Sequence, residues 1–138
     1  NDPESALDIR NTRVAVSTKS NGQFQQGERF DSNDEVSTGY GDSNVKVAGS
    51  DGSYAAVWVR QTEDITENVV PGTALDDGQQ MLQINSTEIM AATSTGGSDW
   101  TLEQLTDNST PDLAPVVAAS GNRIIVAWRE SILRTPPI

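Results

Sequence analysis

A hairpin pattern that occurs twice, 70 residues apart, is the feature that most constrains the fold. The later copy, residues 115–128, consists of a short apolar segment, a Gly121-Asn122 turn and a second apolar segment. This arrangement is typical of a β-hairpin. The ungapped matches are Val47-Ala48 with Val117-Ala118, Tyr54 to Val57 with Ile124 to Ala127, and Trp58 with Trp128. The chain therefore contains an internal repeat.

A second pattern, in residues 13–26, also has a later copy. It contains an alternating segment, a polar turn at 18–22 and a second short segment, so we expect another hairpin. An offset of 76 places Ala15-Val16-Ser17 on Ala91-Ala92-Thr93, Asn21 on Gly97, and Phe24 on Trp100. The two offsets differ by a change in loop length, so both patterns belong to one larger repeating unit.

The full unit, residues 45–105, is predicted to contain four strands. They are 45–48, 54–60, 88–93 and 100–105. The second of them is apolar on both faces, which favours a position between two layers of sheet. The fourth alternates and is expected to be an outer, solvent-facing strand. Half units are expected at 9–30 and 115–130, on either side of the full unit.

The remaining segments are predicted to be turns, loops or chain ends. The disordered lead-in is 1–8, the loops are 31–44 and 106–114, the hairpin turn is 49–53, the acidic linker is 61–77, a short strand is 81–84, and the tail is 135–138. The chain opens with Asn instead of Met, so we expect it to be processed or cut from a longer polypeptide.

Composition narrows the possible functions. A net charge of −11 opposes binding to nucleic acid and to anionic membrane surfaces, so neither is an expected partner. The chain has no cysteine and no histidine, which excludes disulfides, zinc sites built on these residues and every histidine-dependent catalytic triad. Abundant Asn, Ser, Thr, Asp and Gly with few lysines are typical of secreted or surface-displayed bacterial proteins, so we expect an extracellular location.

Tandem four-stranded meanders are typical of the blades of a β-propeller. The segment Thr93-Ser94-Thr95-Gly96-Gly97-Ser98-Asp99-Trp100 resembles the Asp-box of the sialidase or BNR-repeat propeller superfamily, with pattern Ser-x-Asp-x-Gly-x-Thr-Trp. Thr93, Gly97 and Trp100 match, whereas Thr95 stands at the Asp position and Asp99 at the Thr position. The earlier copy keeps Ser17 and Phe24, and Asn21 stands at the Gly position.

The resemblance covers about 110 of the 138 residues and implies an all-β fold of four-stranded antiparallel propeller blades, present here as a partial propeller of about two blades. In that family the box is a structural turn: its glycine permits a positive φ, a side-chain oxygen closes the turn, and its aromatic residue packs between strands. An immunoglobulin-like β-sandwich is the alternative fold if the 70-residue repeat is accidental.

Candidate binding residues are the repeated tryptophans and the arginines that follow them: Trp58, Arg60, Trp128 and Arg129. Exposed aromatic rings can stack on sugars, so carbohydrate is a possible ligand. Recurrence at equivalent positions favours the other interpretation, in which both tryptophans are core residues.

No catalytic residues are predicted. The arginines lack the Arg-Ile-Pro setting of sialidases, and the carboxylates that glycosidases need crowd into the acidic linker. The acidic segments 31–35 and 42–44 do not match a calcium-binding loop, so neither a metal nor a cofactor is expected.

The sequence thus predicts a non-catalytic structural or binding module of a secreted or surface bacterial propeller. Its expected partners are other copies of itself or the remaining part of a longer propeller chain. Two alternatives stay open: a fragment of a sialidase-like glycoside hydrolase, and an oligomeric propeller lectin.

Overall fold

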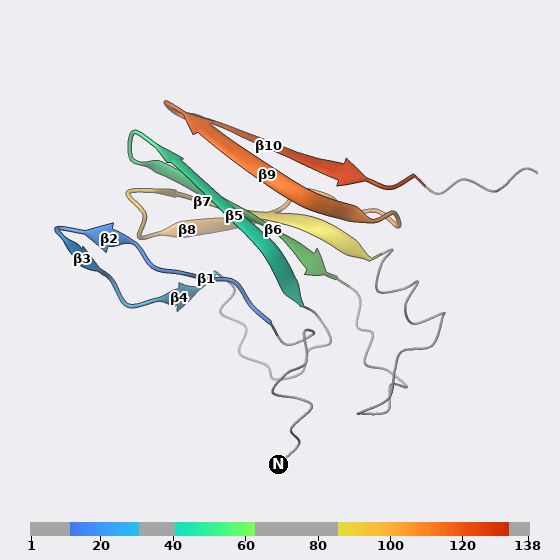
Figure 1. The fold of residues 1–138 in the computed structure, drawn as a ribbon, viewed down its shortest axis with the longest axis horizontal. Helices are drawn as coiled ribbons and strands as arrows, with labels where there is room; N and C mark the ends of the chain where they lie inside the picture. Colours follow the sequence, from blue (N-terminus) through green and yellow to red (C-terminus); the bar gives the residue numbers. More distant parts are fainter. Residues whose placement is uncertain (1–11, 31–40, 63–85, 133–138) are drawn as a thin grey trace, which may run out of the picture.

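The computed structural model describes residues 12–30, 41–62 and 86–132 (Figure 1). In these three segments all regular structure is β-strand and no helix is present. The strands are β1 (Ala15–Val16), β2 (Lys19–Ser20), β3 (Gln23–Phe24), β4 (Glu28–Arg29), β5 (Asp42–Ser50), β6 (Ser53–Gln61), β7 (Thr87–Thr95), β8 (Trp100–Gln104), β9 (Asp112–Ser120) and β10 (Arg123–Glu130). The predicted all-β class is confirmed.

The central element is an antiparallel sheet with strand order β5-β6-β7-β8. Consecutive strands pair along the chain, so this sheet is a simple meander, and its strands contain or overlap the four predicted ones. The β5–β6 turn is two residues long, shorter than predicted for 49–53. Asp51 (φ 51°) and Gly52 (φ 81°) both have positive φ, which matches the right-handed twist of the paired strands.

The predictions of loops at 31–44 and 106–114 are wrong at their last residues. Asp42 to Asn44 belong to β5, and Asp112 to Ala114 belong to β9. Asn44 and Ala114 have φ of 57° and 55°, and the pairing register shifts beside each of them. A β-bulge therefore interrupts each strand without ending it, and the two bulges lie 70 residues apart.

Three two-stranded sheets, β1-β4, β2-β3 and β9-β10, lie along the two sides of the meander (Figure 1). The hairpin of β9 and β10 lies on one side, where β9 contacts β5, β6 and β7. The segment from β1 to β4 lies on the other side, where Val14 packs against β6 and β7. The predicted placement of β6 between two layers is therefore confirmed.

The β1–β4 segment pairs differently from its predicted form. The expected turn at 18–22 narrows to Asn21 and Gly22, with φ of 54° and 81°, between β2 and β3. Beyond a kink at Ser17 and Thr18, β1 pairs with β4. Two hydrogen bonds with Gln25 hold this kink. The Ser17 hydroxyl donates to the Gln25 carbonyl, and the Gln25 N–H donates to the Thr18 carbonyl.

The core forms where the β1–β4 segment meets the meander. Its buried members are Val14, Ala56, Trp58, Met90 and Ala92, with Phe30, Trp100 and Leu102 packed against them. The rings of Phe30 and Trp58 stack with centroids 5.1 Å apart, and Trp100 meets Phe30 edge-on at 4.9 Å. These aromatic contacts join residues from three separate strands or loops.

Some predictions concern residues outside the described segments. They are the lead-in 1–8, the short strand 81–84, the tail 135–138, and all of the acidic linker except Gln61 and Thr62.

We predict unequal stability losses when the two repeated tryptophans are truncated. Trp58 has no exposed surface, whereas Trp128 is 37% exposed. Trp58→Ala should lower the free energy of unfolding by about 3 to 5 kcal/mol. Trp128→Ala should lower it by roughly 1 to 2 kcal/mol. Urea titration followed by circular dichroism measures both.

Trp58→Phe serves as the milder variant if Trp58→Ala does not fold. The Trp58 indole N–H has no acceptor among the described residues, so the Phe variant loses packing without losing a hydrogen bond. Equal losses at Trp58 and Trp128 would contradict the core assignment.

Candidate functional site

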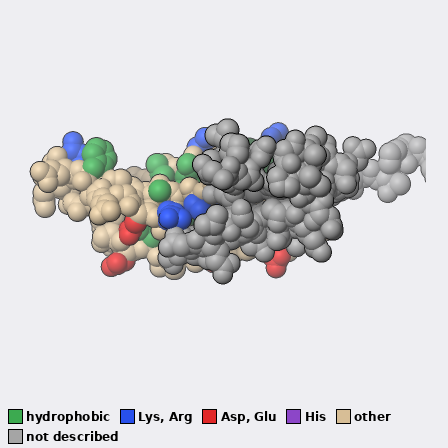
Figure 2. Space-filling model, turned by 90° about the horizontal axis from the view of Figure 1, so that it is seen from below, with side chains coloured by type: hydrophobic (Ala, Val, Ile, Leu, Met, Phe, Trp, Pro, Cys, Tyr) green, Lys and Arg blue, Asp and Glu red, His purple; other side chains and the backbone are tan. Residues whose placement is uncertain are grey.

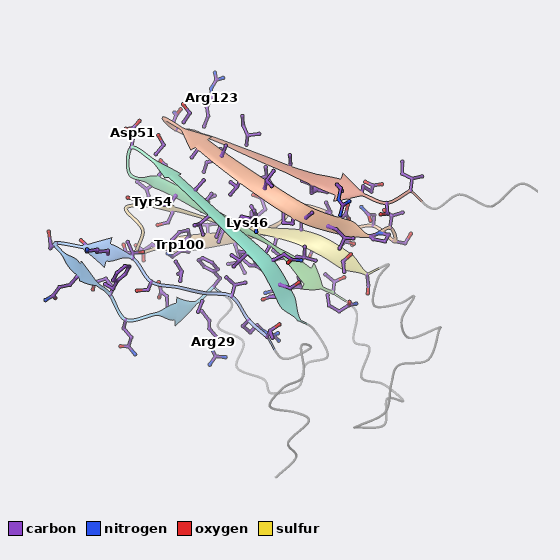
Figure 3. All side chains as sticks on the ribbon, in the orientation of Figure 1. Arg29, Lys46, Asp51, Tyr54, Trp100 and Arg123 are labelled. Atoms are coloured by element: carbon purple, nitrogen blue, oxygen red, sulfur yellow. The ribbon has the colours of Figure 1, made fainter. Side chains whose placement is uncertain are left out.

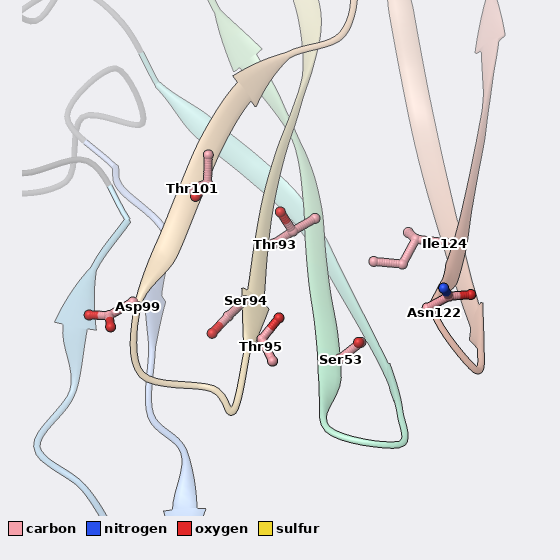
Figure 4. Close-up of a pocket in the computed structure, with 8 residues that line it drawn as sticks. All are labelled: Ser53, Thr93, Ser94, Thr95, Asp99, Thr101, Asn122 and Ile124. Atoms are coloured by element: carbon pink, nitrogen blue, oxygen red, sulfur yellow. The ribbon is translucent and has the colours of Figure 1, made fainter.

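A polar pocket of about 410 Å³ lies between the β7–β8 end of the meander and the β9–β10 turn (Figure 4). Hydroxyl groups dominate its walls, and Asp99 is its single ionisable lining residue. The lining residues are Ser53, Thr93, Ser94, Thr95, Asp99, Thr101, Asn122 and Ile124.

Strand pairing brings these hydroxyl groups together. Thr93 on β7 is directly opposite Thr101 on β8, and Thr95 is directly opposite Ser53 on β6. Cross-strand pairs of this kind line one face of a sheet. Across the pocket, Ile124 of β10 presents the one apolar side chain of the lining (Figure 4).

The turn between β7 and β8 borders this pocket and has the geometry expected of an Asp-box-like turn. Gly96 and Gly97 have φ of 86° and 81°, and the Ser94 hydroxyl accepts a hydrogen bond from the Gly97 N–H at 3.0 Å. The closing oxygen comes from Ser94, one residue after the matched Thr93. A Cβ on Gly97 would lie 2.8 Å from the Thr18 side chain, and the Thr18 hydroxyl donates to the Gly97 carbonyl at 2.7 Å.

The earlier copy of the turn is only partly similar. Asn21 has the positive φ expected at the Gly position. Phe24, however, is 71% exposed and packs beneath the Lys19 ammonium, 5.8 Å from its ring centroid, instead of between strands. The aromatic core position on this side of the meander is taken by Phe30.

A second pocket, of about 530 Å³, lies between the β1–β2 segment and the β5–β6 hairpin. Its lining is more apolar and includes Val47, Tyr54 and Trp100. Val47 is 69% exposed although its register partner Ala56 is fully buried. The β1–β4 segment therefore covers the middle of the meander on this side and leaves β5 open.

Two of the four predicted binding residues, Trp58 and Arg60, lie on β6, and the other two, Trp128 and Arg129, lie on β10. None of the four is among the described lining residues of either pocket. Trp58 is fully buried, so a ligand has no access to its ring. Trp128 is 37% exposed, and the adjacent Arg129 is exposed. Carbohydrate binding by Trp128 and Arg129 remains a prediction.

Arg60 forms a structural ion pair that the sequence analysis did not anticipate. Its Nε and one terminal nitrogen donate to the two carboxylate oxygens of Asp42, at 2.7 and 3.0 Å. The two side chains are 15% and 1% exposed. Such a bidentate pair fixes both the angle and the distance between β5 and β6 beside the bulge.

We predict that Arg60→Leu lowers the free energy of unfolding by about 3 to 5 kcal/mol, because it leaves the buried Asp42 carboxylate without its cation. The double variant Asp42→Asn/Arg60→Leu should recover most of that loss, because no unpaired charge remains. Denaturant titration of both variants gives the comparison. A double variant as unstable as the single one would show that Arg60 stabilises through something other than this charge.

A buried pair of carboxyl groups lies beside this ion pair, because Glu88 is directly opposite Arg60 in the β6–β7 register, and it was missed entirely. Glu88 is 1% exposed, and Asp112 has no exposed surface. Glu88 accepts hydrogen bonds from the Thr106 hydroxyl and from the Asn108 N–H. Neither carboxylate oxygen of Asp112 has a hydrogen-bond donor among the described residues.

The sequence did contain a signal for this pair. Asp112 and Glu130 stand 70 residues after Asp42 and Arg60, so the second copy has the buried aspartate with a glutamate at the arginine position. Removal from water raises the pKa of the Glu88 carboxyl, and the neighbouring Asp112 raises it further, while the bonds from Thr106 and Asn108 oppose the shift. Glu88 thus holds its proton to a higher pH than an exposed glutamate does.

This raised pKa predicts a specific pH dependence of stability. Above the ordinary value of 4.5 the folded state binds more protons at Glu88 than the unfolded state does. The contribution of Glu88 to the free energy of unfolding is therefore fully present below pH 4.5 and falls as pH rises through the higher folded pKa. Glu88→Gln removes this titration, so the variant should gain stability relative to wild type as pH rises from about 4.5 to 8.

Urea titrations at several pH values measure this difference. Glu103→Gln, on the exposed strand β8, is the control for losing one negative charge. A stability difference between Glu88→Gln and wild type that stays constant with pH would refute the account.

Comparison with known proteins does not identify a relative of this chain, so its function is inferred from the geometry of the described residues. No protein-family model matches the chain, and the searches of curated proteins and of solved structures found no match either. The described segments contain no cluster of three or more Asp, Glu, His or Cys side chains that could hold a metal ion. No helix in them is long and apolar enough to cross a membrane.

Proposed function

We propose that this chain is a non-catalytic structural module of a secreted or surface-displayed bacterial β-propeller, contributing about two blades. One observation carries the proposal: two half sheets that repeat parts of the meander pack on its two sides. The β9–β10 hairpin repeats β5–β6 at an offset of 70, bulge included. The β1–β4 segment matches β7–β8 in sequence at an offset of 76, although its pair Ala15–Arg29 is two residues out of the β7–β8 register.

The order of the strands also favours a propeller over the immunoglobulin-like alternative. The strands of the meander pair strictly in chain order, as in a propeller blade. An immunoglobulin-like sandwich distributes consecutive strands between two sheets through Greek-key connections. The two flanking parts also correspond to different halves of a blade. The β9–β10 hairpin corresponds to the inner strands β5 and β6, and the β1–β4 segment on the opposite side corresponds to the outer strands β7 and β8.

Unequal burial of equivalent residues supports incompleteness. Ala55 is 1% exposed in β6, and its counterpart Ile125 in β10 is 68% exposed. Ala55 lies on the face of β6 that the β9–β10 hairpin covers, whereas no described element covers the equivalent face of β10, which also pairs only with β9 in the described part of the chain. Long apolar edge strands of this kind attract further strands.

The residues around the two pockets support a non-catalytic role. Glycoside hydrolysis generally uses two carboxyl groups that reach the same substrate. Among the described residues, Asp99 is the single carboxyl group lining either pocket, and neither Glu88 nor Asp112 lines one of them. If the chain is instead a fragment of a sialidase-like hydrolase, its catalytic carboxyl groups come from elsewhere.

The lectin alternative has one favourable observation, the exposed Trp128 beside Arg129. A glycan array separates the two functions. As a scaffold, the chain should give no signal above background, and Trp128→Ala should change nothing. Specific binding that disappears in Trp128→Ala but persists in Phe24→Ala, which removes another exposed aromatic ring, would favour the lectin and contradict the scaffold.

We further predict that the isolated chain does not persist as a folded monomer of 14.8 kDa. Two blades leave open edges and apolar faces, and propellers close with about four to eight blades. Light scattering after size-exclusion chromatography, with circular dichroism on the same sample, measures mass and folding together. A well-folded monomer would contradict the propeller proposal.

A further inference from the structure

We infer that a second copy of this chain completes the sheet at β10, by adding its β1–β4 segment as the missing outer strands. This inference rests on the proposed propeller module and specifies its partner. The copies would join head to tail, with the last half sheet of one molecule and the first half sheet of the next forming one four-stranded blade.

The receiving edge is β10. It is eight residues long, carries Ile125 at 68% exposure, and has no second neighbour within the described segments. Its counterpart β6 has β7 at the equivalent edge, where Ala55, Ala56 and Val57 are directly opposite Thr93, Ala92 and Ala91. A strand resembling β7 is therefore what β10 lacks.

The chain itself contains a strand that resembles β7. The offset of 76 places Ala15, Val16 and Ser17 at the positions of Ala91, Ala92 and Thr93. In the described residues β1 pairs with β4 alone, which leaves its other edge available. Within its own molecule β1 lies on the far side of the meander from β10, so this pairing has to join two molecules (Figure 1).

Transferring the β6–β7 register through both offsets gives the expected intermolecular pairs. They are Ile125 with Ser17, Val126 with Val16, and Ala127 with Ala15. Ile125, Ser17, Ala127 and Ala15 are exposed in the single chain, so no rearrangement of the core is needed to reach them.

The hydroxyl-lined pocket is where the incoming segment would lie. It is the uncovered face of β7 and β8 directly beside β10 (Figure 4). On the opposite face of the same two strands, the chain's own β1–β4 segment is already in place, with Val14 against Met90 and Ala92. A second copy would cover this open face with the side of its β1–β4 segment that is turned away from its own meander.

Charge favours this partner. Residues 12–30 carry three basic side chains and one acidic one, although the whole chain has a net charge of −11. Arg29 points outward from β4, away from the meander (Figure 3), and basic side chains reach the surface on this side of the molecule (Figure 2). The receiving segment 86–132 carries six acidic and two basic residues, with Asp99 and Glu103 exposed on the β7–β8 side. Opposite charges therefore meet across the contact.

A head-to-tail contact of this kind joins two different surfaces and closes into a ring when the rotation per copy is right. With about two blades from each copy and about four to eight blades in a propeller, a closed ring would contain roughly two to four copies.

Cysteine cross-linking tests the register without background, because the natural chain contains no cysteine. Ser17→Cys and Ile125→Cys are purified separately under reducing conditions, mixed and oxidised. Residues directly opposite each other on antiparallel strands have Cα atoms about 4.5 to 5.5 Å apart, within disulfide range. We expect a disulfide-linked dimer containing one of each variant. The mixture of Ser20→Cys with Ile125→Cys is three residues out of register and should cross-link far less.

A second measurement examines the edge itself. Ile125→Lys places a charge on the receiving strand and should reduce the mass in solution to that of a single chain. Ile132→Lys changes an equally exposed isoleucine, at 73%, beyond the end of β10 and should leave the mass of the wild-type assembly unchanged.

The outcomes separate the two proposals. Association without the Ser17–Ile125 cross-link, or association unaffected by Ile125→Lys, overturns this inference and leaves the propeller module standing. A wild-type chain that is monomeric and unfolded overturns the inference alone, because a second copy then fails to complete the sheet. A folded monomer overturns both.

Discussion

The structure depends on the need to cover both faces of β6. Val57 and Trp58 are adjacent, so their side chains point to opposite faces of the sheet, and both are fully buried. Burying such a strand requires one layer on each side. The aromatic stack of Trp58 on Phe30 supplies one layer, and the β9–β10 hairpin supplies the other. Each layer that covers β6 also has an outer face and an edge of its own. In the β9–β10 hairpin these are the face that carries Ile125 and the free edge of β10.

The two copies of the repeat solve one electrostatic problem in different ways. In the first copy the buried Asp42 carboxylate is neutralised by Arg60 on the neighbouring strand. In the second copy the equivalent Asp112 faces Glu130 in register, and the nearby Glu88 carboxyl has a raised pKa. The raised pKa keeps the Glu88 carboxyl protonated to a higher pH, which limits the number of buried negative charges, at the cost of a stability that falls with rising pH.

The sequence was sufficient for the four strands of the meander and for the β9–β10 hairpin, but not for the pairing of β1 to β4 or for the contacts between the sheets. The hairpin turns at Asp51-Gly52 and Gly121-Asn122 and the two-sided apolar pattern of β6 are local signals in the sequence. Both hairpins and the two-sided strand were predicted from them. The bulged starts of β5 and β9 were missed because Asn44 and Ala114 break the alternation that marks a strand. The Phe30–Trp58 stack joins residues 28 positions apart, and the pairing of Asp42 with Arg60 depends on a bulge, so neither is visible in a local pattern.

The same limit explains why the sequence could not show that the four predicted binding residues lie apart in the structure. Trp58 and Trp128 look alike in sequence, yet Trp58 is buried because Phe30 covers its ring, whereas Trp128, on the edge strand β10, is 37% exposed. A sugar site uses accessible aromatic surface together with polar groups, whereas the described lining of the pocket beside β10 offers hydroxyls, Asp99, Asn122 and one isoleucine but no aromatic ring. Small β-branched and hydroxyl side chains on an open sheet face, beside the edge strand β10, are the kind of surface on which another sheet can pack.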